Sequence, residues 1–241
     1  MAAAHFVSHA LTHTGLVRRR NEDAVLDRPE RGLWAVADGM GGHEEGDYAS
    51  ACIAAALDGL ELPHSFDEFV AAVEQCLHAV DGELRMRASR LGPYAVIAST
   101  VVVLLAAECE VVAIWAGDSR LYRWRAGEFR QVTTDHSQVQ EMVEAGLLSA
   151  EEARTHPYSH IVTRAIGIGP IELGMIRIQF AAGDRFLLCS DGLTNIVSDN
   201  EIAAAIAAGA PRPAAEQLRD LVLARGAPDN VTITIAAAEP G

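Results

Sequence analysis

Four aspartates of this chain follow or precede short apolar runs, next to small or turn-forming residues. They are Asp38, Asp118, Asp191 and Asp229. A single Asp-Gly pair is a turn signal and no more, because both residues suit tight bends. Four such aspartates at the ends of buried strands predict something further. Converging carboxylates repel one another and raise one another's pKa values unless a cation lies among them.

The donors in this set are oxygens, with no cysteine pair or histidine pair beside them. Carboxylate and carbonyl oxygens are the ligands that hard cations such as Mg²⁺ and Mn²⁺ prefer. The glycines after Asp38, at 39, 41 and 42, would let the backbone approach a bound ion. This stretch matches neither the phosphate-binding loop that ends in Gly-Lys-Ser/Thr nor the dinucleotide fingerprint. The pattern therefore predicts a divalent-cation site and no nucleotide cofactor.

Three arginines, Arg18 to Arg20, stand directly before Asn21, Glu22 and Asp23. One interpretation is a charged turn that faces solvent. The other is that an arginine holds a phosphate or carboxylate through two parallel hydrogen bonds, while the acids join the cation cluster. Taken together with the four aspartates, the second interpretation is favoured.

Strands must place these side chains. The sequence predicts strands at 33–37, 99–105, 111–116, 121–124, 185–189 and 231–235, which are β-branched or tightly apolar and bounded by turn residues. It predicts helices in pairs, within 45–90 and 198–226, with Ser-x-x-Glu starts at Ser65, Ser149 and Ser198. Runs of strands without helices between them favour antiparallel pairing, so we expect two sheets covered by helices.

Composition limits the possible classes of protein. The 241 residues are 50% hydrophobic and carry 19 Lys+Arg against 33 Asp+Glu, a net charge of −14. A chain this apolar can fold, and one domain is expected. The charge disfavours binding of nucleic acid, because phosphate backbones are repelled. The excess acid is either a solvated surface or carboxylates gathered around cations. Four widely spaced cysteines predict buried, reduced thiols, and no signal peptide or membrane span is visible, so we expect a cytoplasmic protein.

Six short motifs in order carry a resemblance to a known family. They are Gly15-Leu16-Val17-Arg18 with Asn21-Glu22-Asp23, Ala37 to His43, Gly117 to Arg120, Asp135-His136-Ser137, Ser190 to Leu193, and Asp229 to Thr232. The chain resembles the bacterial branch of the metal-dependent protein serine/threonine phosphatases, the protein phosphatase 2C group, from about residue 5 to 237. The resemblance implies an α+β fold, a four-layer α-β-β-α sandwich of two antiparallel sheets flanked by helix pairs. It implies a single phosphatase domain over 1–241.

The resemblance also assigns roles to residues. It implies a centre of two Mn²⁺ or Mg²⁺ ions held by Asp38, Asp191, Asp229 and the Gly39 carbonyl, with Glu22 and Asp23 in the outer shell, Asp118 on a third ion, and Arg18 on the substrate phosphate. The two ions would share a water that attacks phosphorus. We expect removal of the ions by a chelator to lower the melting temperature.

The leaving alkoxide needs a proton. This chain has Met40 where the animal branch of the family has a histidine directly after Asp-Gly. His43 is a candidate general acid, and a water on a metal ion is the alternative.

The segment 137–170 matches a flap that stands beside the active site in the family, and an ordinary surface subdomain is the alternative. The implied substrates are phosphorylated proteins, opposite a cognate Ser/Thr kinase, and type VI secretion control is one candidate pathway. We expect a monomer that binds neither nucleic acid nor membrane. Two alternatives stay open: a catalytically inactive phosphoprotein-binding module on the same fold, and a hydrolase of small phosphoesters.

Overall fold

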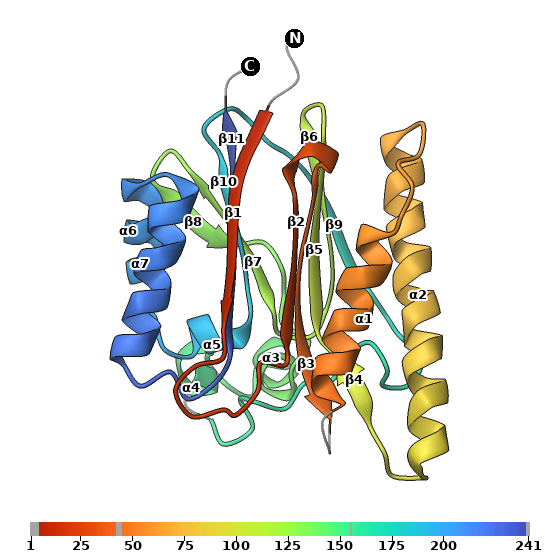
Figure 1. Cartoon of the computed structure of the whole chain (residues 1–241). Coiled ribbons are helices and arrows are strands. Elements are labelled where there is room, and N and C mark those ends of the chain that lie inside the picture. The colour runs from red at the N-terminus through yellow and green to blue at the C-terminus, as the bar shows by residue number, and fades with distance from the viewer. Residues whose placement is uncertain (1–4, 42–44, 155, 240–241) are drawn as a thin grey trace.

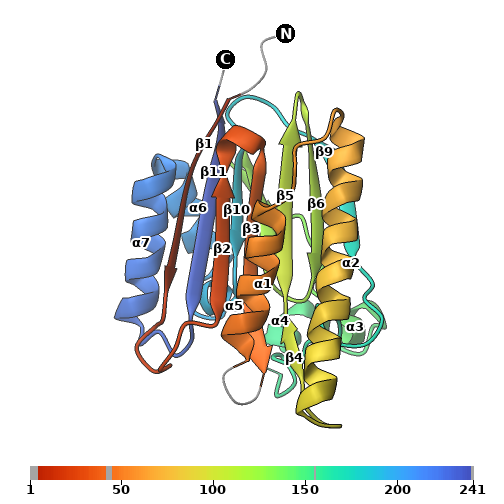
Figure 2. The ribbon, with the colours of Figure 1, turned by 45° about the vertical axis from the view of Figure 1, so that its right-hand side comes forward.

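Two antiparallel sheets pack face to face, and helices cover the outer side of each sheet (Figures 1 and 2). The structure is a computed structural model that describes residues 5–41, 45–154 and 156–239. The arrangement confirms the predicted α+β fold, a four-layer α-β-β-α sandwich.

The first sheet has five strands in the order β1-β11-β10-β7-β8. Their bounds are β1 His5–His13, β11 Val231–Glu239, β10 Arg185–Cys189, β7 Arg120–Arg125 and β8 Glu128–Gln131. The second sheet follows the order β2-β3-β5-β6-β9, and β4 pairs with the end of β3. Its strands are β2 Asp23–Arg28, β3 Leu33–Gly41, β4 Ile97–Ser99, β5 Val101–Ala107, β6 Glu110–Ala116 and β9 Gly174–Gln179.

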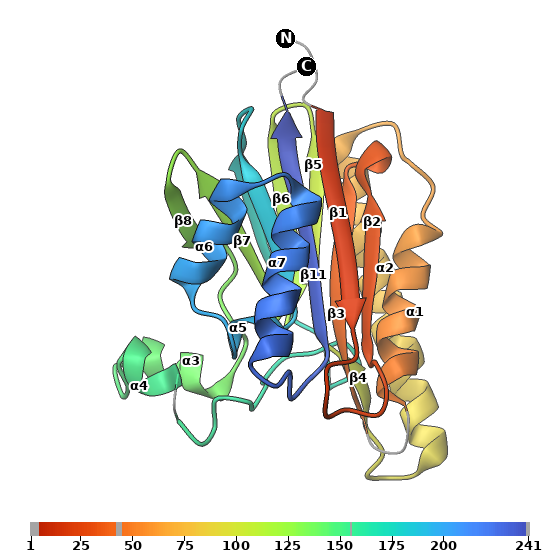
Figure 3. The ribbon, with the colours of Figure 1, turned by 60° about the vertical axis from the view of Figure 1, so that its left-hand side comes forward.

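The predicted helix pairs are present. Helices α1 (Gly46–Asp58) and α2 (Phe66–Leu91) cover the second sheet, while α6 (Asp199–Ala208) and α7 (Pro211–Ala224) cover the first. A short helix, α5 (Asp191–Thr194), packs against β10 and β11. A 3₁₀ turn, Pro29–Arg31, joins β2 to β3. Helices α3 (Gln138–Glu144) and α4 (Ala150–Arg154) project beside α5, at the end of the molecule away from the chain termini (Figure 3).

Central strands are apolar on both faces because each sheet is buried on both sides. Along β5, Val101, Val103 and Leu105 enter the core beneath α1 and α2. The alternate residues Val102 and Leu104 enter the core between the two sheets. All five side chains are fully buried. A near-continuous apolar run in the sequence therefore indicates a strand that packs against a core on each of its two faces.

The three Ser-x-x-Glu patterns all lie at helix starts. Ser198 and Glu201 form the complete reciprocal box at α6, and Ser149 and Glu152 exchange the same two hydrogen bonds at α4. At α2 the Ser65 hydroxyl accepts from the Glu68 amide, but the Glu68 carboxylate accepts from the amide before Ser65. Each pattern thus satisfies backbone N–H groups that have no partner inside the helix.

Three strand boundaries differ clearly from the prediction, and one of them is the end of β11, which continues past 235 to Glu239. Strand β3 does not end at 37 but continues to Gly41, because Gly39–Gly41 pairs with β4 after the pairing with β5 has ended. The predicted strand 99–105 is divided at Thr100 into β4 and β5. Strands β2, β8 and β9 were not predicted, and β9 is an edge strand whose apolar residues Met175 and Ile176 are exposed.

The prediction of buried cysteines is wrong in part. All four cysteines are free, as expected, but Cys109 is exposed and Cys189 alone is fully buried. Cys109 lies in the tight turn between β5 and β6, where an apolar neighbourhood in the sequence does not imply burial. In the described part of the chain, no helix combines the length and apolar character that a membrane crossing requires.

Candidate active site

The predicted acidic residues come together at one end of the sandwich. Strands β3, β6 and β10 end there and β11 begins there, opposite the chain termini (Figure 1). The carboxyl of Asp38 lies within electrostatic range of Asp23, Asp118, Asp191 and Asp229. Antiparallel strands that enter and leave the same end of the two sheets thus place acids from distant parts of the chain side by side.

Asp38 and Asp23 stand directly opposite each other on β3 and β2, the last pair of that ladder. The backbone of Asp38 is fixed by Thr100, whose amide donates to the Asp38 carbonyl at 2.9 Å. Burial, and then the charges of Asp23 and Asp191, raise the pKa of Asp38 well above its usual range. An ionised Asp38 therefore needs a positive partner.

Asp23 is a buried carboxyl with one satisfied oxygen. Its Oδ2 accepts hydrogen bonds from the hydroxyls of Ser190 (2.8 Å) and Thr232 (2.7 Å). Its Oδ1 finds no hydrogen-bond partner among the described residues. Burial raises the pKa of Asp23 to about 6, even though the two hydroxyls lower it. The unpartnered oxygen is a ready acceptor for a water molecule or a cation.

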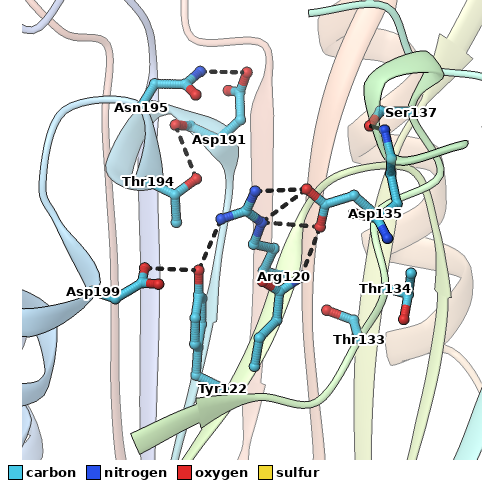
Figure 4. A network of polar contacts seen from close by, with 12 residues as sticks. Arg120, Tyr122, Thr133, Thr134, Asp135, Ser137, Asp191, Thr194, Asn195 and Asp199 are labelled. Carbon is cyan, nitrogen blue, oxygen red and sulfur yellow. Dashed lines mark hydrogen bonds and ion pairs between the residues drawn. The ribbon is translucent and has the colours of Figure 1, made fainter. Parts of the chain in front are cut away.

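Asp191 begins α5 and Asp118 lies in the turn between β6 and β7. Asn195, one turn after Asp191, donates to its Oδ2 at 3.0 Å, as Figure 4 shows. Burial and the charge of Asp229 raise the pKa of Asp191. Burial and the charge of Asp191 raise the pKa of Asp118 to about 7. Both carboxyls therefore hold a proton more readily than an exposed aspartate does.

Arg18 supplies positive charge at the edge of this cluster. Its Nη2 donates to Asp229 Oδ2 at 2.7 Å, and both side chains are partly exposed. That hydrogen bond is the main cause that raises the pKa of Arg18. Burial raises the pKa of the nearby Glu22 carboxyl, while the charge of Arg18 lowers it. A guanidinium has five N–H donors, so Arg18 retains donors for another anion while it holds Asp229.

Asn230 is a residue whose importance the sequence did not reveal. Its Oδ1 accepts from the Glu22 amide, and its Nδ2 donates to the carbonyls of Thr14 and Arg20, all within 2.8–2.9 Å. The side chain is almost fully buried. One amide therefore fastens the whole loop that carries Arg18 to the start of β11. The sequence offered one signal only, an Asp-Asn pair before a strand.

Two glycines permit close approach of the backbone at this end. A Cβ at Gly39 would collide with the carbonyl oxygens of Gly46 and Glu22, and a Cβ at Gly192 would collide with the carbonyl oxygen of Asn230. Gly39 thus allows α1 to begin directly beside β3, and Gly192 allows α5 to lie on the start of β11. Both contacts bring the segments that carry the acidic residues close together.

The cluster gathers carboxylates without forming a complete ligand cage. Within residues 5–41, 45–154 and 156–239, no three His, Cys, Asp or Glu side chains already stand in metal-binding geometry. The donor set still fits a hard divalent cation, because it consists of oxygens, its carboxyls disfavour their charged forms, and Asp23 Oδ1 lacks a partner. His43, the candidate general acid, lies outside the described residues.

A first prediction concerns the charge of Asp118. The pKa is about 7 in the folded protein against an ordinary value of 3.8. The folded state therefore keeps a proton that the unfolded chain loses between these pH values, and stability falls as pH rises through this window. Replacement Asp118→Asn removes the ionised form. In the presence of a chelator it should raise the melting temperature more at about pH 8 than at about pH 5.

Thermal unfolding followed by circular dichroism measures this effect. Asp220→Asn, on the exposed side of α7, is the control and should show the same small change at both pH values. A gain for Asp118→Asn that does not depend on pH would contradict the prediction.

A second prediction concerns Asn230. Asn230→Asp keeps the shape but replaces the two donated hydrogen bonds by repulsion from the carbonyls of Thr14 and Arg20. The free energy of unfolding should fall by at least about 1–3 kcal/mol, the cost of leaving buried polar groups unpaired. Urea denaturation measures it, with Asn200→Asp on the exposed surface of α6 as the control. Equal stability of the two variants would show that this clamp is unimportant.

Comparisons with known proteins agree with this geometry. The family model described as "Protein phosphatase 2C" matches residues 16–224. The serine/threonine protein phosphatase PstP of Mycobacterium tuberculosis is 35% identical over 227 residues, which are 94% of this chain and 44% of that protein. This chain thus spans less than half the length of that relative.

Solved structures are similar over nearly the whole chain. The structure titled "PppA, a key regulatory component of T6SS in Pseudomonas aeruginosa" has a TM-score of 0.91 and 39% identity, with 98% of this chain and 99% of that chain covered. The catalytic domain of PstP in complex with two manganese ions has a TM-score of 0.84 and 34% identity, over 98% of this chain and 99% of that one. From the matched family model and these relatives, this chain belongs to the protein phosphatase 2C family.

Proposed function

We propose that this protein hydrolyses phosphoserine and phosphothreonine on proteins, at a centre of two divalent cations. The observation that carries the proposal is the set of converging acids, Asp23, Asp38, Asp191 and Asp229, beside the guanidinium of Arg18. Membership of the family and the likeness to a manganese-containing PstP domain support it.

The proposed ligands are Asp38, Asp191, Asp229 and the carbonyl of Gly39, with Glu22 and Asp23 in the outer shell and Asp118 on a third ion. We take the ions to be Mn²⁺ or Mg²⁺, because hard cations suit an all-oxygen donor set. When bound, such ions provide a nucleophile from water near neutral pH and neutralise phosphate charge.

Residues of the chain then bind and orient the phosphate ester. Arg18 can hold equatorial phosphate oxygens through donors that Asp229 does not use. Asn230 fixes the loop of Arg18 by three hydrogen bonds, which places the guanidinium before substrate arrives. The hydroxyls of Ser190 and Thr232 hold Asp23 Oδ2, which leaves its unpartnered Oδ1 as an acceptor. His43 stays the candidate donor of a proton to the leaving alkoxide.

The wider role follows from the same proposal. The segment 137–170, which includes α3 and α4, would act as a flap that contacts the substrate protein. The substrates would belong to a Ser/Thr kinase system, and the likeness to PppA supports a place in type VI secretion control. Four free cysteines suit the reducing cytoplasm. We take the working form to be a monomer.

Replacement Asp38→Asn should abolish metal-dependent hydrolysis of a phosphothreonine peptide, with kcat reduced roughly a hundredfold or more. The reason is that the neutral amide cannot replace a charged oxygen ligand. The rise in melting temperature on adding Mn²⁺ should shrink in the same variant, which gives a readout apart from activity. Asp220→Asn should behave as the unchanged protein in both assays. Activity near that of the unchanged protein in Asp38→Asn would refute this centre.

Replacement Arg18→Ala should mainly raise KM. Loss of charged hydrogen bonds to phosphate costs about 1.5–3 kcal/mol, or roughly 10- to 150-fold in affinity. Arg19→Ala is the matched control, because Arg19 is the exposed neighbour in the same loop. Steady-state kinetics on an aryl phosphate and on a phosphopeptide measure the effect. If Arg19→Ala raised KM as much as Arg18→Ala, the assignment of the phosphate to Arg18 would be wrong.

A further inference from the structure

Thr100 is a buried residue at the junction of β4 and β5, and only 1% of its surface is exposed. On the neighbouring strand β3, Gly39 pairs with Ser99. Because the two chains run antiparallel, the residue before Gly39, which is Asp38, faces Thr100. The junction therefore places a buried hydroxyl beside the backbone of one proposed metal ligand.

The hydroxyl of Thr100 takes the place of a backbone group in holding Asp38. The Thr100 amide donates to the Asp38 carbonyl at 2.9 Å, as in a regular ladder. In the opposite direction, the Asp38 amide donates to Thr100 Oγ1 at 3.3 Å. The Thr100 carbonyl accepts instead from the Ser99 hydroxyl at 2.7 Å. The position of the Asp38 backbone thus depends on a side chain as well as on the strand.

The same hydroxyl reaches the segment that carries Asp118. Thr100 Oγ1 and Ser119 Oγ lie 2.7 Å apart, in a hydrogen bond for which either group can be the donor. Ser119 follows Asp118 in the chain and is also 1% exposed. A buried hydrogen bond fixes both segments, because leaving either hydroxyl unpaired costs free energy. Thr100 therefore connects the segments of Asp38 and Asp118, whose carboxyls lie within electrostatic range of each other.

The methyl group of Thr100 makes a separate contact. Gly117, in the same turn as Asp118, has a φ of 111°, and a Cβ there would lie 2.6 Å from the Thr100 methyl. The bare backbone of Gly117 therefore packs against this methyl. The two contacts can be removed one at a time. Thr100→Val removes the hydroxyl and keeps the methyl, whereas Thr100→Ser does the reverse.

We propose that Thr100 is a positioning residue of the metal centre, whose hydroxyl holds the segments of Asp38 and Asp118 in the relative position that cation binding requires. The inference rests on the proposed function and adds to it a residue that touches no substrate. Asp38 is a proposed ligand of the two-ion centre and Asp118 of a third ion. Thr100 would thus link the third ion to the other two.

Calorimetric titration of Mn²⁺ into the chelator-treated full chain tests this. Thr100→Val should weaken the affinity for Mn²⁺ by about tenfold, the lower end of the range for groups that orient metal ligands. Thr100→Ser should keep the affinity of the unchanged protein, even though loss of the buried methyl lowers its melting temperature. A role in stability alone would instead make the affinity fall together with the melting temperature in both variants.

Ser119→Ala removes the hydroxyl at the other end of the link. It should weaken Mn²⁺ binding as Thr100→Val does, and the double variant should bind no more weakly than the more affected single variant. Thr234→Val is the matched control. Thr234 is a fully buried threonine of β11, and its Oγ1 has no hydrogen-bond partner in the part of the chain that the structure describes. This variant should keep the affinity for Mn²⁺.

Three results would overturn the proposal. The first is an affinity for Mn²⁺ in Thr100→Val equal to that of the unchanged protein. The second is a loss in Thr100→Ser as large as that in Thr100→Val. The third is an equal loss in Thr234→Val, which would show that any such change in a buried threonine acts on the centre.

A separate measurement distinguishes this proposal from the proposed function. If the unchanged protein neither binds Mn²⁺ nor turns over p-nitrophenyl phosphate, the phosphatase itself is refuted. The melting temperatures of Thr100→Val, Ser119→Ala and the double variant then decide whether the hydroxyls link the two segments. A loss in the double variant smaller than the sum of the single losses supports the link, and a loss equal to that sum overturns it.

Discussion

Repulsion among carboxylates at one end of the sandwich is the constraint on which the rest of the structure depends. The charges of Asp23, Asp118, Asp191 and Asp229 all raise the pKa of Asp38. A set of ionised acids this close would separate unless the chain held them rigidly or a cation neutralised them. Rigid holding comes from the strands, because Asp23 and Asp38 are paired residues of one ladder and Asp191 follows directly on β10. The free energy that offsets this repulsion comes from the burial of apolar side chains in three cores.

The same constraint explains the uncharged groups around the cluster. Ser190 and Thr232 donate to Asp23, Asn195 donates to Asp191, and Asn230 fastens the Arg18 loop. Each of these side chains supplies donors without adding a full charge. A lysine in their place would neutralise an acid permanently and compete with a cation. Neutral donors orient the carboxylates and leave their charge available, as outer-shell groups do around metal ions.

Much of this arrangement was predictable from sequence because it depends on local signals. Apolar runs such as 185–189 marked buried strands, Ser198 and Glu201 marked a helix start, and acids at the ends of strands marked the cluster. What could not be predicted depends on contacts between distant residues. Asn230 meets Thr14 and Arg20 across more than 200 positions, and no local pattern encodes that clamp. Strand β9 lies at a sheet edge and is only six residues long, and the boundary of β3 depends on its partner β4.

Arg18 and Arg120 show how one residue type serves two purposes at this end of the molecule. Arg120 is largely buried and holds Asp135 through three N–H···O contacts, so its positive charge is neutralised within the fold. It also lines a polar cavity beside Asn195. Arg18 is about half exposed and touches Asp229 through one nitrogen, so most of its donors face solvent. A guanidinium saturated by a carboxylate cannot also bind phosphate, whereas a singly bonded one can. The difference in saturation therefore favours Arg18 over Arg120 for the proposed recognition of the phosphate.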